Sequence, residues 1–137
     1  MPLPLRLEPD IAVLPRLVAY IADFGNLHHL PASDVHAVTL AAEELLANTV
    51  NHSPMPAHLV DFSLTLTPEG ALAVYTDDAP AFDPTAHPEP DTTLSASARP
   101  IGGLGIHFIR LSMSTFRYRR IDGRNEVTFG RTLSRPS

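Results

Sequence analysis

The hydrophobic and polar positions predict two helices in the first half of the chain. Between residues 8 and 26, apolar residues recur at helical spacing, and the pattern ends near Gly25 and Asn26. A second helix is predicted to start at Ser33, a candidate N-cap, and to stop before Pro54. The apolar stripe of the first helix comprises Ile11, Leu14, Leu17, Val18 and Ile21, and that of the second comprises Val35, Val38, Ala42, Leu45 and Thr49.

Two β-hairpins are predicted in the second half. Residues 58–67 and 71–78 alternate or run apolar on either side of the turn Pro-Glu-Gly, which is typical of two antiparallel strands. Residues 115–133 show a second pair of strand-like runs, which turn at Asp122 and Gly123. The sequence therefore predicts four strands.

A long loop and a short helix separate the hairpins. Residues 79–102 carry five prolines without a clear period, and a loop of this length in a compact domain is more often a lid or binding loop than a passive connection. Residues 103–114 predict a third helix. This order of elements predicts an α+β fold, a two-layer sandwich with about three helices on a mixed, mostly antiparallel sheet.

The size and composition predict one cytoplasmic domain. A chain of 137 residues suffices for a single domain spanning residues 1–137. There is no Cys, which excludes disulfides, thiolate metal sites and thiol nucleophiles and fits a reducing compartment. No apolar run approaches the length of a membrane span, and the first residues lack the features of a signal peptide. We expect no contact with a membrane.

The charge distribution limits the possible ligands. Residues 1–98 contain 13 acidic residues and 2 Arg, whereas residues 99–137 contain 2 acidic residues and 8 Arg. The basic part is interleaved with strand residues and the whole chain carries a charge of -5, so direct nucleic-acid binding is not expected. The absence of Lys excludes a Gly-Lys-Ser/Thr phosphate loop and Schiff-base chemistry. Any bound nucleotide must be held without a lysine.

Three polar residues recur every fourth position along the second predicted helix. Glu44, Asn48 and His52 are about 40° apart around the helix axis, so they form one polar strip beside the core stripe. This strip is either an ordinary solvated face or a ligand site. Asn is a mediocre helix former, and a surface strip more usually pairs Glu with Lys or Arg. A carboxylate and an amide oxygen one turn apart suit Mg²⁺, which normally arrives with phosphates.

Two further segments carry candidate chemistry. Asp77 and Asp78 end a predicted strand, where adjacent side chains point to opposite faces, so at most one of them faces a site. Alternatively, both simply end the strand and begin a turn.

Gly102, Gly103 and Gly105 precede or begin the third helix, and free N–H groups there form an anion site that needs no lysine. Alternatively, these glycines are a helix start and a hinge.

The three segments, in this order, resemble a known family. "EELLANTVNH" looks like the N box, "DDAPAFDP" like the G1 box and "PIGGLGIHFIR" like the G2 box of the GHKL, or histidine-kinase-like, ATPases. The similarity covers roughly residues 10–133 and is greatest to stand-alone bacterial anti-sigma factor serine/threonine-protein kinases. It implies the Bergerat-type ATP-binding fold, with ATP and Mg²⁺ as cofactors.

The resemblance also implies roles for individual residues. Asn48 matches the Mg²⁺-binding Asn, Glu44 the general base, and Asp77 the carboxylate that accepts the adenine amino group. Asn125 takes the place of a Thr that reaches adenine through water. Residues 84–101 match the ATP lid, in which we expect Arg99 to sense the terminal phosphate, and the phosphates would meet Gly102, Gly103, Leu104 and Gly105.

The G1 box departs from the family pattern, because Ala79 and Ala81 stand where glycines are expected. A methyl group at Ala79 would crowd the adenine or require a different turn, which puts the affinity for ATP in question. Both residues are still expected to border the nucleotide.

The function implied by the resemblance is partner switching. Such a kinase phosphorylates a STAS-domain anti-anti-sigma protein and sequesters a sigma factor. One alternative is an ATP-dependent binding switch that has lost phosphotransfer, and another is an interaction domain in which the boxes are remnants. The sequence leaves homodimerisation open.

Overall fold

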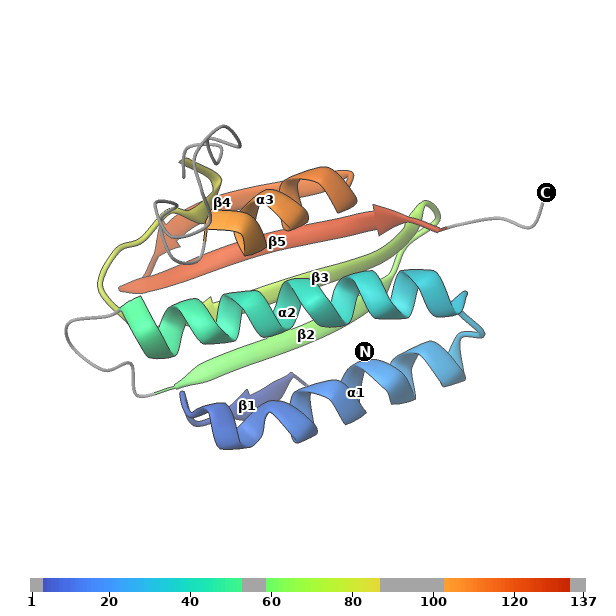
Figure 1. The fold of residues 1–137 in the computed structure, drawn as a ribbon, viewed down its shortest axis with the longest axis horizontal. Helices are drawn as coiled ribbons and strands as arrows, with labels where there is room; N and C mark the ends of the chain where they lie inside the picture. The colour runs from blue at the N-terminus through green and yellow to red at the C-terminus, as the bar shows by residue number, and fades with distance from the viewer. Residues whose placement is uncertain (1–3, 53–58, 87–102, 134–137) are drawn as a thin grey trace.

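The computed structural model describes residues 4–52, 59–86 and 103–133, which form three α-helices on one face of a five-stranded sheet (Figure 1). The strand order is β1-β2-β3-β5-β4, and every neighbouring pair is antiparallel. This arrangement confirms the predicted two-layer α+β sandwich.

Both predicted hairpins are present. The strands are β1 (Leu5–Leu7), β2 (Val60–Leu66), β3 (Gly70–Asp77), β4 (Thr115–Ile121) and β5 (Arg124–Thr132). The turn between β4 and β5 uses Asp122 and Gly123 at φ 52° and 75°, as a two-residue hairpin turn with two left-handed residues requires. Strand β5, the last strand in the sequence, pairs with both β3 and β4 and therefore lies inside the sheet and not at its edge.

The edge strand β1 was missed by the sequence prediction. Leu5 lies opposite Phe62 and Leu7 opposite Val60, so β1 extends the sheet by one short strand. Leu7 is buried, whereas Arg6 points to the other face. A run of three residues is shorter than the four to eight that a period-two pattern needs to be recognised.

The three predicted helices are present, but their boundaries differ from the prediction: a 3-10 turn replaces the start of the first helix, the second starts earlier, and the third ends at Ser112. They are α1 (Leu14–Leu27), α2 (Ala32–His52) and α3 (Gly103–Ser112), with 3-10 turns η1 (Ile11–Val13) and η2 (Pro84–Ala86). Ser33 is not the N-cap, because α2 already begins at Ala32. The carbonyl of Pro31 accepts the N–H groups of Asp34 and Val35, so the helix starts two residues earlier than predicted.

The core lies between the helices and the sheet. The predicted stripe of α2 is buried at Val38, Ala42, Leu45 and Thr49 and partly buried at Val35, which confirms it. In the first helical segment Leu17 and Ile21 are buried, but Ile11 and Val18 are exposed and Phe24 is buried instead. Helix α2 therefore lies in the centre of the helical layer, between α1 and α3 (Figure 1).

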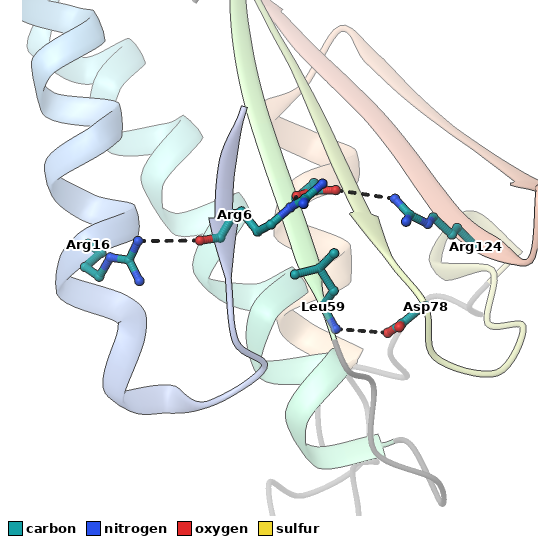
Figure 2. A network of polar contacts seen from close by, with 6 residues as sticks. Arg6, Arg16, Leu59, Asp78 and Arg124 are labelled. Atoms are coloured by element: carbon teal, nitrogen blue, oxygen red, sulfur yellow. Dashed lines mark hydrogen bonds and ion pairs between the residues drawn. The ribbon is translucent and has the colours of Figure 1, made fainter. Parts of the chain in front are cut away.

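The opposite face of the sheet carries a polar network (Figure 2). Asp61 on β2 accepts from Arg6 Nε of β1 at 3.0 Å and from Arg124 Nη1 of β5 at 3.4 Å. Both arginines are substantially exposed, so each pair contributes at most about 1 kcal/mol to stability. Within the described ranges, no helix has both the length and the apolar character needed to cross a bilayer.

Candidate functional site

A pocket of about 110 Å³ opens beside the end of β3. Leu45, Asn48 and Thr49 line it from α2, Tyr75 and Asp77 from β3, and Asn125 and Val127 from β5. The rest of the lining comes from the segment after β3, which includes Ala79, Ala81 and Phe82. The pocket therefore brings together residues of the predicted N box and G1 box.

The carboxylate of Asp77 is buried in this pocket and held by three donors. Its Oδ2 accepts from Thr49 Oγ1 at 2.8 Å, and its Oδ1 accepts from Ala79 N at 3.1 Å and from Asn125 Nδ2 at 2.9 Å. A carboxylate offers about four acceptor positions, so one remains after these bonds. An ionised Asp77 therefore fits a ligand that donates a hydrogen bond, such as an amino group on a flat ring.

Thr49 connects Asp77 to a buried phenol. The Tyr75 hydroxyl lies 2.6 Å from Thr49 Oγ1. When the single hydroxyl hydrogen of Thr49 is donated to Asp77, Tyr75 must donate to Thr49. Burial is the main factor that raises the pKa of Tyr75, so the phenol stays neutral and remains a donor. Sequence analysis missed Tyr75 and gave Thr49 only a packing role.

Asp78 points away from the pocket. Its Oδ1 accepts the backbone N–H of Leu59 at 3.1 Å, which ties the start of β2 to the end of β3 (Figure 2). The prediction that at most one of the two adjacent aspartates faces the site is confirmed, and Asp77 is the one that does.

Ala79 and Ala81 are accommodated by the turn that follows β3. Among the described non-glycine residues, only His29 and Asp122 adopt a positive φ, so neither alanine occupies a backbone conformation that favours glycine. Ala79 is buried and donates its N–H to Asp77, whereas Ala81 is exposed at the pocket edge. Alanine in place of glycine at positions 79 and 81 therefore does not prevent the pocket from forming.

Asn125 lies opposite Asp77 in the β3–β5 register and has its amide occupied by protein groups. Its Nδ2 lies 2.9 Å from Asp77 Oδ1, 3.0 Å from Pro80 O and 3.3 Å from Ala79 O. Its Oδ1 accepts from Phe82 N at 3.1 Å and from Tyr118 Oη at 2.7 Å. Arg120 adds a bond from Nη1 to Ala79 O at 2.7 Å.

Glu44 and Asn48 lie one turn apart on α2, and each has an unsatisfied buried atom. Within the described part of the chain, Glu44 Oε1 and Asn48 Nδ2 have no hydrogen-bond partner. Burial raises the pKa of the Glu44 carboxyl above its ordinary value. Buried polar atoms are normally paired. Two further side-chain atoms, His107 Nδ1 and Ser112 Oγ on α3, also have no partner among the described residues, so the unpaired atoms of Glu44 and Asn48 alone do not define a site.

The start of α3 approaches α2 at Glu44. A Cβ placed on Gly105 would overlap the Glu44 carboxylate, so a larger residue here would require the end of the Glu44 side chain to move. Helix α3 begins at Gly103, and the N–H groups of its first turn lack partners within the helix. Gly105 of the G2 box therefore lies beside Glu44 of the N box, in the first turn of a helix whose N-terminal end suits an anion.

Some predicted site residues lie outside the described ranges. These are Arg99 and Gly102, together with the side chains of His52 and Leu104. Of the predicted lid, residues 84–101, only residues 84–86 are described, as η2, where Pro84 is buried beside the pocket.

Comparison with known proteins identifies the family. The model of the histidine kinase-like ATPase domain matches residues 7–131, so the chain belongs to this family of ATPase domains. The GHKL resemblance based on the three boxes is thereby confirmed, and membership implies an ATP-binding site.

Two relatives give the context. The serine/threonine-protein kinase BtrW of Bordetella bronchiseptica is 34% identical over 93 residues, which are 66% of this chain and 66% of BtrW. The solved structure of the RsbU and RsbW domains of Rv1364c from Mycobacterium tuberculosis matches 99% of this chain with a TM-score of 0.67. The chain covers 34% of that protein, and at 17% identity the match shows the fold alone.

The residues present fit ATP with Mg²⁺. The buried Asp77 acceptor suits the adenine amino group, and Asn48, which lines the same pocket, carries an amide oxygen of the kind that binds a hard cation. In the described segments, no three His, Cys, Asp or Glu side chains gather into a metal site.

Proposed function

We propose that residues 1–137 form one ATP-binding domain that acts as a serine/threonine-protein kinase of the anti-sigma factor type. Its substrate would be a hydroxyl group on a STAS-domain anti-anti-sigma protein, and it would also sequester a sigma factor. The observation that carries the proposal is the position of Glu44, with an unpaired buried oxygen, between the Asp77 pocket and the start of α3. The 34% identity to the kinase BtrW supports it.

The nucleotide-binding residues act by position and charge. When bound, ATP supplies the γ-phosphoryl group and Mg²⁺ neutralises charge on the phosphates. Asp77 would accept the adenine amino group, since Thr49 and Asn125 hold its carboxylate in place. Asn48 would hold the cation through its amide oxygen, and the free N–H groups at Gly103 and Gly105 would face the phosphates.

Glu44 would act as the general base. A carboxylate whose pKa is raised by burial is a stronger base than an exposed one and accepts a hydroxyl proton more readily. The contact with Gly105 limits where this carboxylate can move, so Glu44 is held on the side of α2 that faces α3. The acceptor Ser or Thr hydroxyl would give its proton to Glu44 as its oxygen bonds to the γ-phosphorus, while the bond from that phosphorus to the β,γ-bridging oxygen breaks and ADP leaves.

An ATP-dependent binding switch without phosphotransfer is the second candidate. The alanines at positions 79 and 81 favour it, because they depart from the family pattern without closing the pocket. Both candidates predict ATP binding, whereas only the kinase transfers phosphate.

The test is to incubate the purified protein with γ-labelled ATP, Mg²⁺ and each STAS-domain protein encoded by the same genome. We expect phosphoserine or phosphothreonine on one of them. ATP binding without labelling of any STAS protein would favour the switch. Absence of ATP binding would reject both.

A further inference from the structure

The turn after β3 is held by side chains from the second hairpin. Asp77, Asn125 and Arg120 are direct cross-strand neighbours on β3, β5 and β4. The side chains of Asn125 and Arg120 reach back over the end of the sheet to the carbonyl oxygen of Ala79. The conformation of residues 79–82 is therefore fixed by groups that follow it by some forty residues in the sequence.

The hydrogen-bond pattern leaves one orientation for the Asn125 amide. Phe82 N can only donate, so the atom facing it must be the amide oxygen. The carboxylate of Asp77 and the carbonyl of Pro80 can only accept, so the atom facing them must be the amide nitrogen. The two N–H groups of Nδ2 already serve three acceptors within 3.3 Å. A direct contact to a ligand would require the amide to give up one of these bonds.

We infer that Asn125 is a positioning residue that fixes Asp77 and the 79–82 turn, so that the pocket selects a purine with a 6-amino group over one with a 6-oxo group. The inference rests on the proposed ATP binding and goes beyond it, because it assigns selectivity to a residue that does not touch the base. Asn125 is only 5% exposed, and Tyr118 fixes its oxygen from β4.

The selectivity follows from the geometry of acceptors. A carboxylate held in one place accepts a hydrogen bond from a 6-amino group. Against a 6-oxo group it makes no hydrogen bond, because both groups are acceptors. A ligand that leaves a buried acceptor of the site unpaired binds much more weakly. If Asp77 could swing aside or take up water, this rejection would weaken. Asn125 prevents that by donating to Oδ1, the same oxygen that the Ala79 N–H binds.

The experiment compares the affinities for ATP and inosine triphosphate, which differ at the 6-position of the purine. We expect Asn125→Ala to lower the ATP/ITP affinity ratio by about tenfold, because Asp77 loses one of the donors that hold its carboxylate in place. Asn125→Asp should lower it as well, because two adjacent carboxyl groups would share a proton and Asp77 would no longer be a pure acceptor. Glu126→Gln, the next residue on β5 but on the opposite face, is the control and should leave the ratio unchanged.

The outcomes separate this inference from the proposed function. A folded Asn125→Ala protein with the wild-type ratio would overturn the inference while leaving ATP binding intact. A wild-type protein that does not bind ATP would overturn both. If the Asn125 variants do not fold, Tyr118→Phe decides, because it removes only the hydroxyl that binds Asn125 Oδ1. A smaller fall in the ratio is then expected, and an unchanged ratio would reject the role of Asn125.

Discussion

Glu44 and Gly105 lie against each other where α2 meets α3, so closely that any side chain at position 105 would overlap the Glu44 carboxylate. This contact joins the proposed general base to the helix start proposed to face the phosphates. The glycine of the G2 box therefore has a packing role in addition to any contact with phosphate.

Replacing Gly105 should test this contact directly. Gly105→Ala places a methyl group where the end of the Glu44 side chain lies, so Glu44 must move; because Ala is also the better helix former, we expect a loss of at most about 1 kcal/mol in the free energy of unfolding. Removing the obstruction with Glu44→Ala should restore most of that loss. Chemical denaturation of both single variants and the double variant measures the coupling. If the changes in unfolding free energy of the two single variants add up to that of the double variant, the two residues do not interact.

The stability of the protein should depend on the ionisation of Glu44. Burial raises its pKa in the folded state above the ordinary value of 4.5, so folding favours the protonated form. The favourable contribution is complete below pH 4.5 and is lost as the pH rises through the folded-state pKa. Glu44→Gln should thus stabilise the protein near neutral pH by less than about 1 kcal/mol, because the side chain is only half-buried and solvent screens its charge. A difference from wild type that stays constant in denaturation from acidic to neutral pH would contradict this.

The same substitution should separate binding from chemistry. If Glu44 is the general base, Glu44→Gln retains ATP but slows phosphotransfer to the STAS protein by roughly 10²- to 10⁴-fold. Glu43→Gln makes the same chemical change at the next position of α2 and should leave the rate close to that of wild type. Single-turnover assays with labelled ATP would measure both. Equal rates in the two variants would remove Glu44 from the role of base.

Thr49 should matter for stability through its hydroxyl. Thr49→Val keeps the shape but leaves the Tyr75 hydroxyl and Asp77 Oδ2 each without one partner, at a cost of about 1–3 kcal/mol. Thr39→Val is the matched control, since each threonine hydroxyl lies within hydrogen-bond distance of the carbonyl four residues earlier, at 2.7 Å for Thr39 and 3.1 Å for Thr49. Thermal or chemical unfolding should show a much smaller loss for Thr39→Val. Equal losses would mean that the backbone bond alone accounts for the effect.

The sequence predicted the parts of the site that depend on local pattern. The polar strip of Glu44 and Asn48 follows from helical spacing, and the orientation of Asp77 relative to Asp78 follows from strand alternation. The turn at Asp122 and Gly123 follows from the preference for left-handed residues in a two-residue hairpin.

The remaining features depend on how distant segments meet. The bond between Thr49 and Asp77 requires α2 to dock on β3 at one particular position, which no local pattern encodes. The bonds of Asn125 depend on the pairing of β5 with β3, a long-range register. Strand β1 was missed because three residues carry too little pattern.

The most direct test of the nucleotide site is calorimetric titration of ATP with Mg²⁺ into the wild type and three variants. We expect Asp77→Asn and Asn48→Ala to weaken binding at least tenfold, about 1.4 kcal/mol. Asp78→Asn makes the same change on the adjacent residue, which binds Leu59 instead of facing the pocket, and should bind ATP like the wild type. Equal affinity in all four proteins, or no binding by the wild type, would contradict the assignment of the pocket to ATP.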